Sequence, residues 1–537
     1  MLMKFNNLML YTLLVISQIS WAFTPVFNDS TRKAPANWFN LDYVQDGVPG
    51  ISTERAYREL LQGKKSNTVL VAVIDSGIDI EHEDLKPIIW VNTKEVAGNG
   101  VDDDQNGYID DMYGWNFIGG KDGRHVNGES LELTREYARL RTKYEGNDGE
   151  KNAKKNKEEF EYYQSVKNEY QAKLRETNEQ VMQFQMIADL FKKNKEILQT
   201  KAGVQEMTTE ALSKVQSKDP EVTAAKDMMN QLLGYGLNEE EIKDAEEYLS
   251  NMAEYGCNLD FDSRTIVGDD PNNLKEIGYG NNDVIGPDSK HGTHVAGIIG
   301  AVRDNNMGIK GVANDVRIMV IRCVPNGDER DKDVANAIRY AADNGAKIVN
   351  MSFGKSYSPQ KEVVDEAVQY AMSKGVLLVH AAGNDAKNID LVNNFPSKNY
   401  MRNKGKAENW IEVGALNWGK DGAFVADFTN YGKTQVDVFA PGVDLYSSVP
   451  GSQYSAQSGT SMACPVVSGM AAVLWSYFPQ LTAAQVKEII LKSAVSYAER
   501  KVTKPGAEMM VPFGDLSNTG AVVNLYEAIK LAEQIGK

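Results

Sequence analysis

Residues 459–465 have the sequence Gly-Thr-Ser-Met-Ala-Cys-Pro, and an apolar run at 471–475 follows them in helical register. Proline lacks a backbone N–H and is tolerated in the first turn of a helix, so Pro465 predicts a helix that begins close to this stretch. Ser461 is then expected at or next to the helix N-terminus, where the helix dipole favours negative charge. A serine hydroxyl is a weak nucleophile, so it needs a base, an orienting carboxylate and an oxyanion donor.

Two polar residues follow apolar runs and are candidates for these roles. Asp75 ends a run at 68–74, and Asn384 comes shortly after another run at 376–382. Such runs, rich in β-branched residues and stopped by glycine, are typical of buried parallel strands. Open α/β sheets place functional groups at the carboxyl ends of their strands. Taken singly, each residue is better explained by a turn, since Asp-Ser-Gly and Gly-Asn are common turn sequences.

The candidate base lies in the sequence His-Gly-Thr-His-Val-Ala-Gly, which holds two of the five histidines, His291 and His294. Histidine is the usual general base at neutral pH, and His291 is expected at the start of a helix. A metal pair is the alternative, but two histidines three residues apart without a nearby acidic partner make a poor zinc site. His294 is better explained as a packing and hydrogen-bonding residue.

The segments around these residues alternate between strand and helix patterns, which predicts a parallel α/β sheet. Ser52 is an N-cap candidate for a short helix at 54–62. The strands, with the glycine-containing turns that end three of them, are expected at 68–75, 312–322, 346–354, 376–384, 411–415 and 436–442, and the helices at 333–344, 361–373 and 483–494.

Together, Asp75, His291, Asn384 and Ser461 supply every group that acyl transfer needs, in the chain order Asp, His, Ser. The motifs around them are Val-Ala-Val-Ile-Asp-Ser-Gly-Ile-Asp, His-Gly-Thr-His-Val-Ala-Gly, Ala-Ala-Gly-Asn and Gly-Thr-Ser-Met-Ala-Cys-Pro. On these motifs the chain resembles the subtilisin-like serine proteases of the subtilase family (peptidase S8), over residues 50–128 and 263–530. The resemblance implies an α/β fold, a three-layer α/β/α sandwich with a central, mostly parallel sheet.

The resemblance also implies a serine endopeptidase that works through an acyl-enzyme. His291 would take the proton of Ser461 and later protonate the leaving amine, while Asp75 holds the imidazole in the right tautomer. The Ser461 N–H and the Asn384 amide would hold the oxyanion.

A further stretch, Ser352, Phe353 and Gly354, matches the family's strand that pairs with the substrate backbone and forms a wall of the S1 pocket. Recognition by strand addition accepts many sequences, so the expected partner is a peptide or protein substrate. Val466 and Ser468 depart from the family, which usually has His and Ala at these places. Neither belongs to the triad.

Residues 99–111 contain the pattern D-x-D-x-N-G, with oxygen-bearing side chains at alternate positions and a glycine at the turn. Such a loop wraps a hard cation, so the sequence predicts a structural calcium ion. Tyr113 stands where an EF-hand has its twelfth-position Glu, so the loop is not a full EF-hand; a solvated acidic turn is the alternative. The candidate ligands are Asp102, Asp104, Asn106, the Tyr108 carbonyl and Asp110, with Asp111 as an alternative to the last.

The N-terminus has the features of a secretory signal: Lys4, an apolar stretch at 8–19 and small residues before a cleavage site expected near Ala22. A retained membrane anchor is the alternative; no other apolar stretch is long enough to span a bilayer. We therefore expect a secreted protein, periplasmic or extracellular. The expected organisation is a signal peptide at 1–22, an extended N-terminal arm at 23–50, a peptidase domain at 51–128 and 263–537, and a helical insertion at 129–262.

The insertion separates two catalytic candidates, because Asp75 and His291 lie 216 residues apart. It is rich in Lys, Glu, Gln and Asn, and apolar residues fall on a seven-residue grid between 163 and 198. Two shorter helices, at 221–233 and 238–255, predict a hairpin or small bundle. It would be a spacer lobe, or else a lid or an arm that binds a protein partner. The grid residues are Tyr163, Tyr170, Phe184, Phe191 and Leu198, with Leu174 and Val181 on the companion positions.

The composition excludes some classes. A net charge of −16 gives no support to nucleic-acid binding. Three cysteines are too few for a disulfide framework, and Cys464 is expected to be a buried apolar residue. The alternative function is a secreted interaction or scaffold protein in which the insertion is the functional part. An α/β-hydrolase would want G-x-S-x-G and the order Ser, Asp, His, and a Ser-Glu-Asp peptidase would lack this histidine motif.

Overall fold

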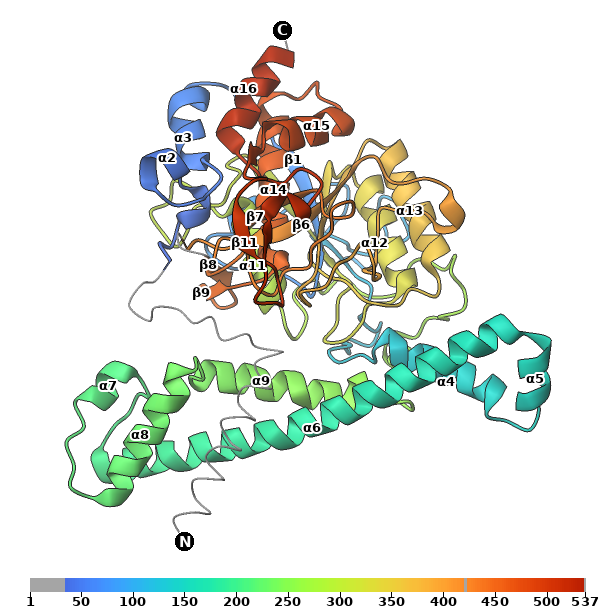
Figure 1. Cartoon of the computed structure of the whole chain (residues 1–537). Helices are drawn as coiled ribbons and strands as arrows, with labels where there is room; N and C mark the ends of the chain where they lie inside the picture. The colour runs from blue at the N-terminus through green and yellow to red at the C-terminus, as the bar shows by residue number, and fades with distance from the viewer. Residues whose placement is uncertain (1–33, 420–422, 536–537) are drawn as a thin grey trace. The chain divides into compact units, whose positions relative to one another are not determined.

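The computed structural model describes residues 34–419 and 423–535, which form two compact units (Figure 1). One unit comprises residues 34–127 and 262–535 and is built on a sheet. The other comprises residues 128–261, and its regular elements are helices. The expected signal peptide at 1–22 lies outside the described residues. Among the described residues, no helix is both long and apolar enough to cross a membrane.

The α/β unit contains a nine-stranded sheet in the order β10-β13-β7-β6-β5-β4-β1-β3-β2. Every pairing in it is parallel except that of β10 with β13. The mostly parallel sheet predicted from the sequence is confirmed. The strands are β1 (Val69–Asp75), β2 (Gly114–Asn116), β3 (Val316–Arg322), β4 (Ile348–Met351), β5 (Leu377–Ala381), β6 (Trp410–Leu416), β7 (Val438–Pro441), β10 (Val495–Ser496) and β13 (Ala521–Val522). Two small hairpins accompany it: β8 (Leu445–Val449) with β9 (Gln453–Gln457), and β11 (Lys501–Thr503) with β12 (Met510–Pro512).

Both faces of the sheet are covered, as the alternation along β1 shows. Val71 and Val73 belong to one buried cluster, whereas Ala72 and Ile74 belong to another. Successive side chains of a strand point to opposite faces, so the two clusters are the two layers between sheet and helices. On the first face lie α11 (Lys290–Gly300), α14 (Thr460–Tyr477), α15 (Ala483–Ser493) and α16 (Leu525–Ile535); on the second lie α12 (Asp331–Asp343) and α13 (Lys361–Ser373). The predicted three-layer sandwich is confirmed.

The start of the α/β unit differs from the extended arm that we expected. Residues 38–46 form helical turns, and Trp38 is fully buried in the core. Ser52 precedes α3 but makes no side-chain cap; its hydroxyl instead accepts from Asn524 Nδ2 at 2.9 Å. Short helices here and elsewhere in the unit are η1 (Trp38–Asn40), α2 (Tyr43–Asp46), α3 (Thr53–Ala56), η2 (Tyr57–Leu61), η3 (Lys86–Ile88), α10 (Arg264–Val267), η5 (Met401–Asn403) and η6 (Phe513–Asp515).

The helical unit is organised along α6, a helix of 46 residues. The five main apolar residues of the predicted seven-residue grid are buried. Three of them, Phe184, Phe191 and Leu198, form one cluster with Met229 of α8 and Leu249 of α9. The elements are α4 (Glu132–Tyr144), α5 (Gly149–Lys155), α6 (Lys157–Ala202), α7 (Thr209–Ser213), α8 (Pro220–Gly234), α9 (Glu239–Asn251) and η4 (Met252–Gly256).

Candidate active site

The candidate nucleophile lies at the N-terminus of α14, as the second residue of the helix. The expectation that Pro465 occupies the first turn is wrong, because α14 begins at Thr460 and Pro465 lies one turn further on. A proline at that position offers no N–H to the carbonyl four residues earlier, which is that of Ser461. Ser352 Oγ supplies the missing donor, at 3.0 Å from the Ser461 oxygen. The proline is tolerated because this hydrogen bond replaces the helical one.

The structure brings together the candidate carboxylate and base. Asp75 is the last residue of β1, and His291 is the second residue of α11. His291 Nδ1 lies 2.7 Å from Asp75 Oδ1, which also accepts the Ser76 N–H at 2.8 Å. The carboxylate is buried, whereas the imidazole is 38% exposed. The pair therefore holds the ring by Nδ1 and leaves Nε2 for a reacting group.

The electrostatics of the pair favour a proton on the imidazole. Burial disfavours the charged ring, but the charge of Asp75 and its hydrogen bond outweigh burial, so the pKa of His291 is raised above its ordinary value of 6.5. A base with a raised pKa accepts the serine proton more readily in the transition state.

The hydroxyl of Ser461 points elsewhere in the absence of substrate. It donates to the carbonyl oxygen of Ser352 at 3.1 Å. Among the described residues, the hydrogen bonds do not include one between Ser461 and His291, so the third link of the predicted triad is not formed here. Catalytic hydrogen bonds often form only when substrate binds, so this geometry does not argue against the role.

Asn384 presents its amide group next to the nucleophile. Its Oδ1 accepts from the Thr460 N–H at 2.8 Å and from the Thr460 hydroxyl at 2.9 Å. Since the oxygen is held by these two donors, the NH₂ group is the end directed away from the helix. A Cβ added at Gly459 would lie 3.5 Å from this nitrogen, so it is close to the backbone that precedes Ser461.

The segment Ser352–Gly354 lies beside the nucleophile, and it is supported by residues that the sequence did not single out. Asn350 donates to Ser352 Oγ at 3.0 Å and accepts from Ser468 Oγ at 2.8 Å. Ser468, which departs from the family's usual residue, thus has a defined hydrogen-bond partner in Asn350, which also donates to Ser352. Asn394 donates to the carbonyl of Ala382 at 3.1 Å, and its oxygen would touch a Cβ at Gly354.

Two secondary predictions are confirmed. His294 is fully buried and its Nε2 faces the carbonyls of Leu445 at 2.9 Å and Ser455 at 3.2 Å, so it packs and hydrogen-bonds as expected. Burial lowers its pKa to about 3, which keeps the ring neutral. Cys464 is a free, buried thiol whose pKa burial raises well above its ordinary value, so it is not a second nucleophile.

In the predicted metal loop, Asp102 and Asp104 come together with Glu95, which was not among the predicted ligands. Ligand oxygens of Glu95, Asp102 and Asp104 all lie within 4.8 Å of one another. Glu95 precedes the loop and has no place in the D-x-D-x-N-G pattern, so no feature of the sequence indicated it as a ligand. The Asp110 carboxylate instead accepts the N–H groups of Asn99 at 3.1 Å and Gly100 at 2.9 Å.

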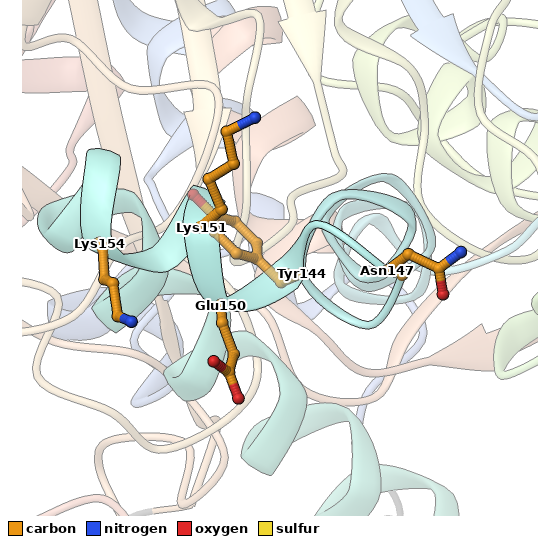
Figure 2. A pocket seen from close by; sticks show the side chains of 7 residues that line it. Tyr144, Asn147, Glu150, Lys151 and Lys154 are labelled. Carbon is orange, nitrogen blue, oxygen red and sulfur yellow. The ribbon is translucent and has the colours of Figure 1, made fainter.

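The helical unit has an open hollow of its own, where α4 meets α5 (Figure 2). Its labelled side chains point in different directions, and the hollow contains no residue of the catalytic set. We therefore place the candidate chemistry in the α/β unit. The hollow has a volume of about 650 Å³ and is lined by Tyr144, Gly146, Asn147, Gly149, Glu150, Lys151 and Lys154.

Comparison with known proteins agrees with this geometry. The model of the subtilase family matches residues 66–514. The chain is 43% identical to the thermophilic serine proteinase of Bacillus sp. (strain AK1) over 189 residues, which cover 35% of this chain and 43% of that protein. It is 40% identical to thermitase of Thermoactinomyces vulgaris over 187 residues, covering 35% of this chain and 61% of that one. It is 34% identical to subtilisin DY of Bacillus licheniformis over 210 residues, covering 39% and 72%.

The chain spans less than two thirds of the length of two of these three relatives. Among solved structures, a mutant of the protease domain of PatA shares 27% identity, covers 46% of this chain and 81% of that chain, and has a TM-score of 0.36.

Proposed function

Because this chain belongs to the subtilase family, we propose that it is a serine endopeptidase that hydrolyses peptide bonds through an acyl-enzyme on Ser461. The observation that carries the proposal is the 2.7 Å hydrogen bond between Asp75 and His291, two residues 216 positions apart that meet at a strand end and a helix start. A structural role alone would not need a partly exposed imidazole held by a buried carboxylate.

The proposed mechanism gives each group a defined role. With a peptide bound, the Ser461 hydroxyl leaves the Ser352 carbonyl and gives its proton to His291 Nε2 as the oxygen attacks the scissile carbonyl. Asp75 stabilises the imidazolium that forms. The Asn384 amide and the Ser461 N–H take the oxyanion, and His291 then protonates the leaving amine. Water repeats the same steps on the ester and frees Ser461.

The substrate would lie along Ser352–Gly354. The Ser352 carbonyl faces the nucleophile, since it accepts from Ser461 Oγ. A peptide that adds as a strand to this segment brings its scissile bond to Ser461, and pairing through the backbone is tolerant of sequence.

We also propose a structural calcium ion at the cluster of Glu95, Asp102 and Asp104. Carboxylate oxygens are the ligands that calcium prefers, and three of them lie within 4.8 Å here. Glu95 also accepts the N–H groups of Asp104 at 3.0 Å and Asp110 at 3.1 Å, so it ties the loop together. When bound, the ion would offset the repulsion among these carboxylates; Asn106, Tyr108 and Asp110 remain predicted ligands. Secretion rests on the N-terminal sequence and stays a proposal.

The test of the proposed function is labelling of the mature protein with a fluorophosphonate, beside Ser461→Ala and with or without a calcium chelator. We expect label on the wild type alone, and loss of label after chelation would support the calcium proposal. A wild type that takes no label would contradict an assembled serine nucleophile.

The helical unit's role as a lid or a partner-binding arm stays a prediction. Deletion of residues 130–256 tests it, with a short peptide and a folded protein as substrates. A lid predicts that the deletion speeds cleavage of the folded protein more than that of the peptide. Equal rates before and after deletion on both substrates would refute the lid.

A further inference from the structure

A buried histidine outside the quoted motifs contacts the backbone of the proposed substrate-binding segment, residues 352–354. His380 of β5 is fully buried, and its Nε2 lies 2.8 Å from the carbonyl oxygen of Phe353. Its position in the chain is four residues before Asn384. β5 therefore carries His380, which contacts the substrate-binding segment, and is followed by Asn384, the candidate oxyanion donor.

The direction of this contact matters because carbonyls alternate along an extended chain. The Ser352 carbonyl faces the nucleophile, whereas the next one, that of Phe353, faces the buried His380. The hydrogen bond to the Phe353 carbonyl thus fixes how the segment 352–354 is rotated about its own axis. The outer groups, on Ser352 and Gly354, are those that a substrate strand would meet.

The ring is in turn held by a buried carboxylate. His380 Nδ1 lies 2.9 Å from Glu412 Oε1, and Trp410 Nε1 donates to Glu412 Oε2 at 2.8 Å. Glu412 is 4% exposed, on β6 next to β5. Both ring nitrogens face oxygen atoms, and a carbonyl oxygen can only accept, so Nε2 carries a hydrogen and donates to Phe353. A proton shared between Nδ1 and Oε1 holds the ring in this orientation.

Such a pair is costly to bury and gives little stability by itself. Apolar residues of similar volume often serve a core equally well or better than a buried ion pair. Its presence at this place is explained by the carbonyl that it holds, since an apolar side chain could not bind Phe353. The ring centroid of Trp410 lies 5.2 Å from that of His380, and both members of the pair are buried, where hydrogen bonds are stronger than in water.

We propose that His380 and Glu412 are positioning residues of the peptidase, which fix the Phe353 carbonyl and so set the edge that binds the substrate backbone. This inference rests on the proposed function. It predicts that the pair acts on the binding of extended peptides and leaves the reactivity of Ser461 alone.

The test combines His380→Phe with Glu412→Gln, which keeps an aromatic side chain and leaves no unpaired carboxylate. Glu412→Gln alone is the conservative comparison, because a glutamine amide can donate to His380 Nδ1 and still accept from Trp410. Two rates are measured: kcat/KM for an extended peptide amide with a large aromatic P1 residue, and phosphorylation of Ser461 by diisopropyl fluorophosphate with loss of fluoride, which needs no strand pairing.

For the double variant we expect kcat/KM to fall about tenfold to a hundredfold, mainly through KM, as for loss of one buried hydrogen bond. Phosphorylation should stay within about twofold in both variants, and Glu412→Gln alone should lower kcat/KM less than the double variant does. If the double variant does not fold, His380→Asn, whose shorter side chain withdraws from Phe353, is measured with the same expected split.

Two results would overturn the proposal. One is an unchanged kcat/KM in the variant that lacks the histidine. The other is an equal fall in both rates, which would mean general damage to the core. A wild type that neither cleaves nor labels would instead contradict the proposed function, so the two failures are distinguishable.

Discussion

The two units of this protein pair their polar side chains differently, although α4 of the helical unit also buries Glu132 and Glu136 in ion pairs. In the α/β unit, Asp75, Asn350 and His380 are buried and each has a defined partner at a strand end. In the helical unit, ion pairs such as that of Lys201 with Glu221 lie on the surface, with side chains 44% and 52% exposed. Surface pairs contribute little to stability, whereas a buried polar group is costly unless it is paired.

The difference teaches where to look for chemistry. In the α/β unit, the buried and paired polar groups lie near the candidate catalytic residues, despite the free-energy cost of burying them. The helical unit depends on an apolar seam along α6, with Phe191 and Leu198 buried against α8 and α9. We therefore expect changes in the first unit to alter the reaction, and changes in the second to alter stability or access.

The largest expected effect is that of Ser461→Ala. Removal of the nucleophile should lower kcat by about 10⁴- to 10⁶-fold, leaving what the oxyanion donors and binding supply. The matched control is Ser213→Ala in the helical unit, whose hydroxyl donates only to the Glu210 carbonyl. Peptide hydrolysis is the measurement; a comparable loss in both variants would break the comparison between the units.

Asp75→Asn should lower kcat by about 10⁴-fold, because the imidazole is no longer held in the right tautomer. The pH profile gives a second readout. The pKa of His291 is raised in the folded protein, so its ion pair stabilises the fold below pH 6.5, and that contribution is lost as the pH rises through the raised pKa. Activity needs the neutral ring, so it should rise over the same window.

In the Asp75→Asn variant, the rising limb of kcat/KM should therefore move to lower pH. A limb that stays in place would show that the limiting group is not His291.

Asn384→Ala should lower kcat by about 100- to 1,000-fold with little change in KM, as for loss of one oxyanion donor. Asn251→Ala in α9, which removes a donor to the Glu247 carbonyl, is the control in the other unit. An effect confined to KM would assign Asn384 to ground-state binding instead.

The sequence was sufficient for the sheet and for Asp75 and His291, which the structure brings together, because both leave local signals. Apolar runs stopped by glycine predict strands, and the motifs around Asp75, His291 and Ser461 are short. Pro465 was misplaced because its tolerance depends on Ser352, which donates to the Ser461 carbonyl from 109 positions earlier in the chain.

The supporting residues were missed for the same reason. His380 lies within an apolar run, and nothing near it in the sequence reveals that Glu412 and the Phe353 carbonyl are its partners. Glu95 was overlooked because it precedes the metal motif. Contacts between residues on different strands form only when the sheet assembles, so they leave no periodicity in the sequence. Residues that support a site are therefore harder to predict than the residues of the site itself.

A smaller effect is expected from Phe191→Ala in α6. Truncation of this buried ring should cost the helical unit about 3–5 kcal/mol. Thermal unfolding followed by calorimetry should show a transition that moves, while hydrolysis of a short peptide stays within about twofold. A parallel loss of peptide hydrolysis would mean that the two units do not separate in function.

The smallest effect concerns calcium, and it should fall on the α/β unit alone. An ion at Glu95, Asp102 and Asp104 that is present at a hundred times its Kd adds about 2.7 kcal/mol to the stability of the form that binds it. Chelation should therefore lower the melting temperature of the α/β unit and leave the transition altered by Phe191→Ala where it is. The double variant Asp102→Asn/Asp104→Asn should melt lower than the wild type and respond no further to chelation, because the ligands are already gone. If chelation shifts this variant as much as the wild type, the ion binds elsewhere, and the acidic loop is the solvated turn that the sequence left as an alternative.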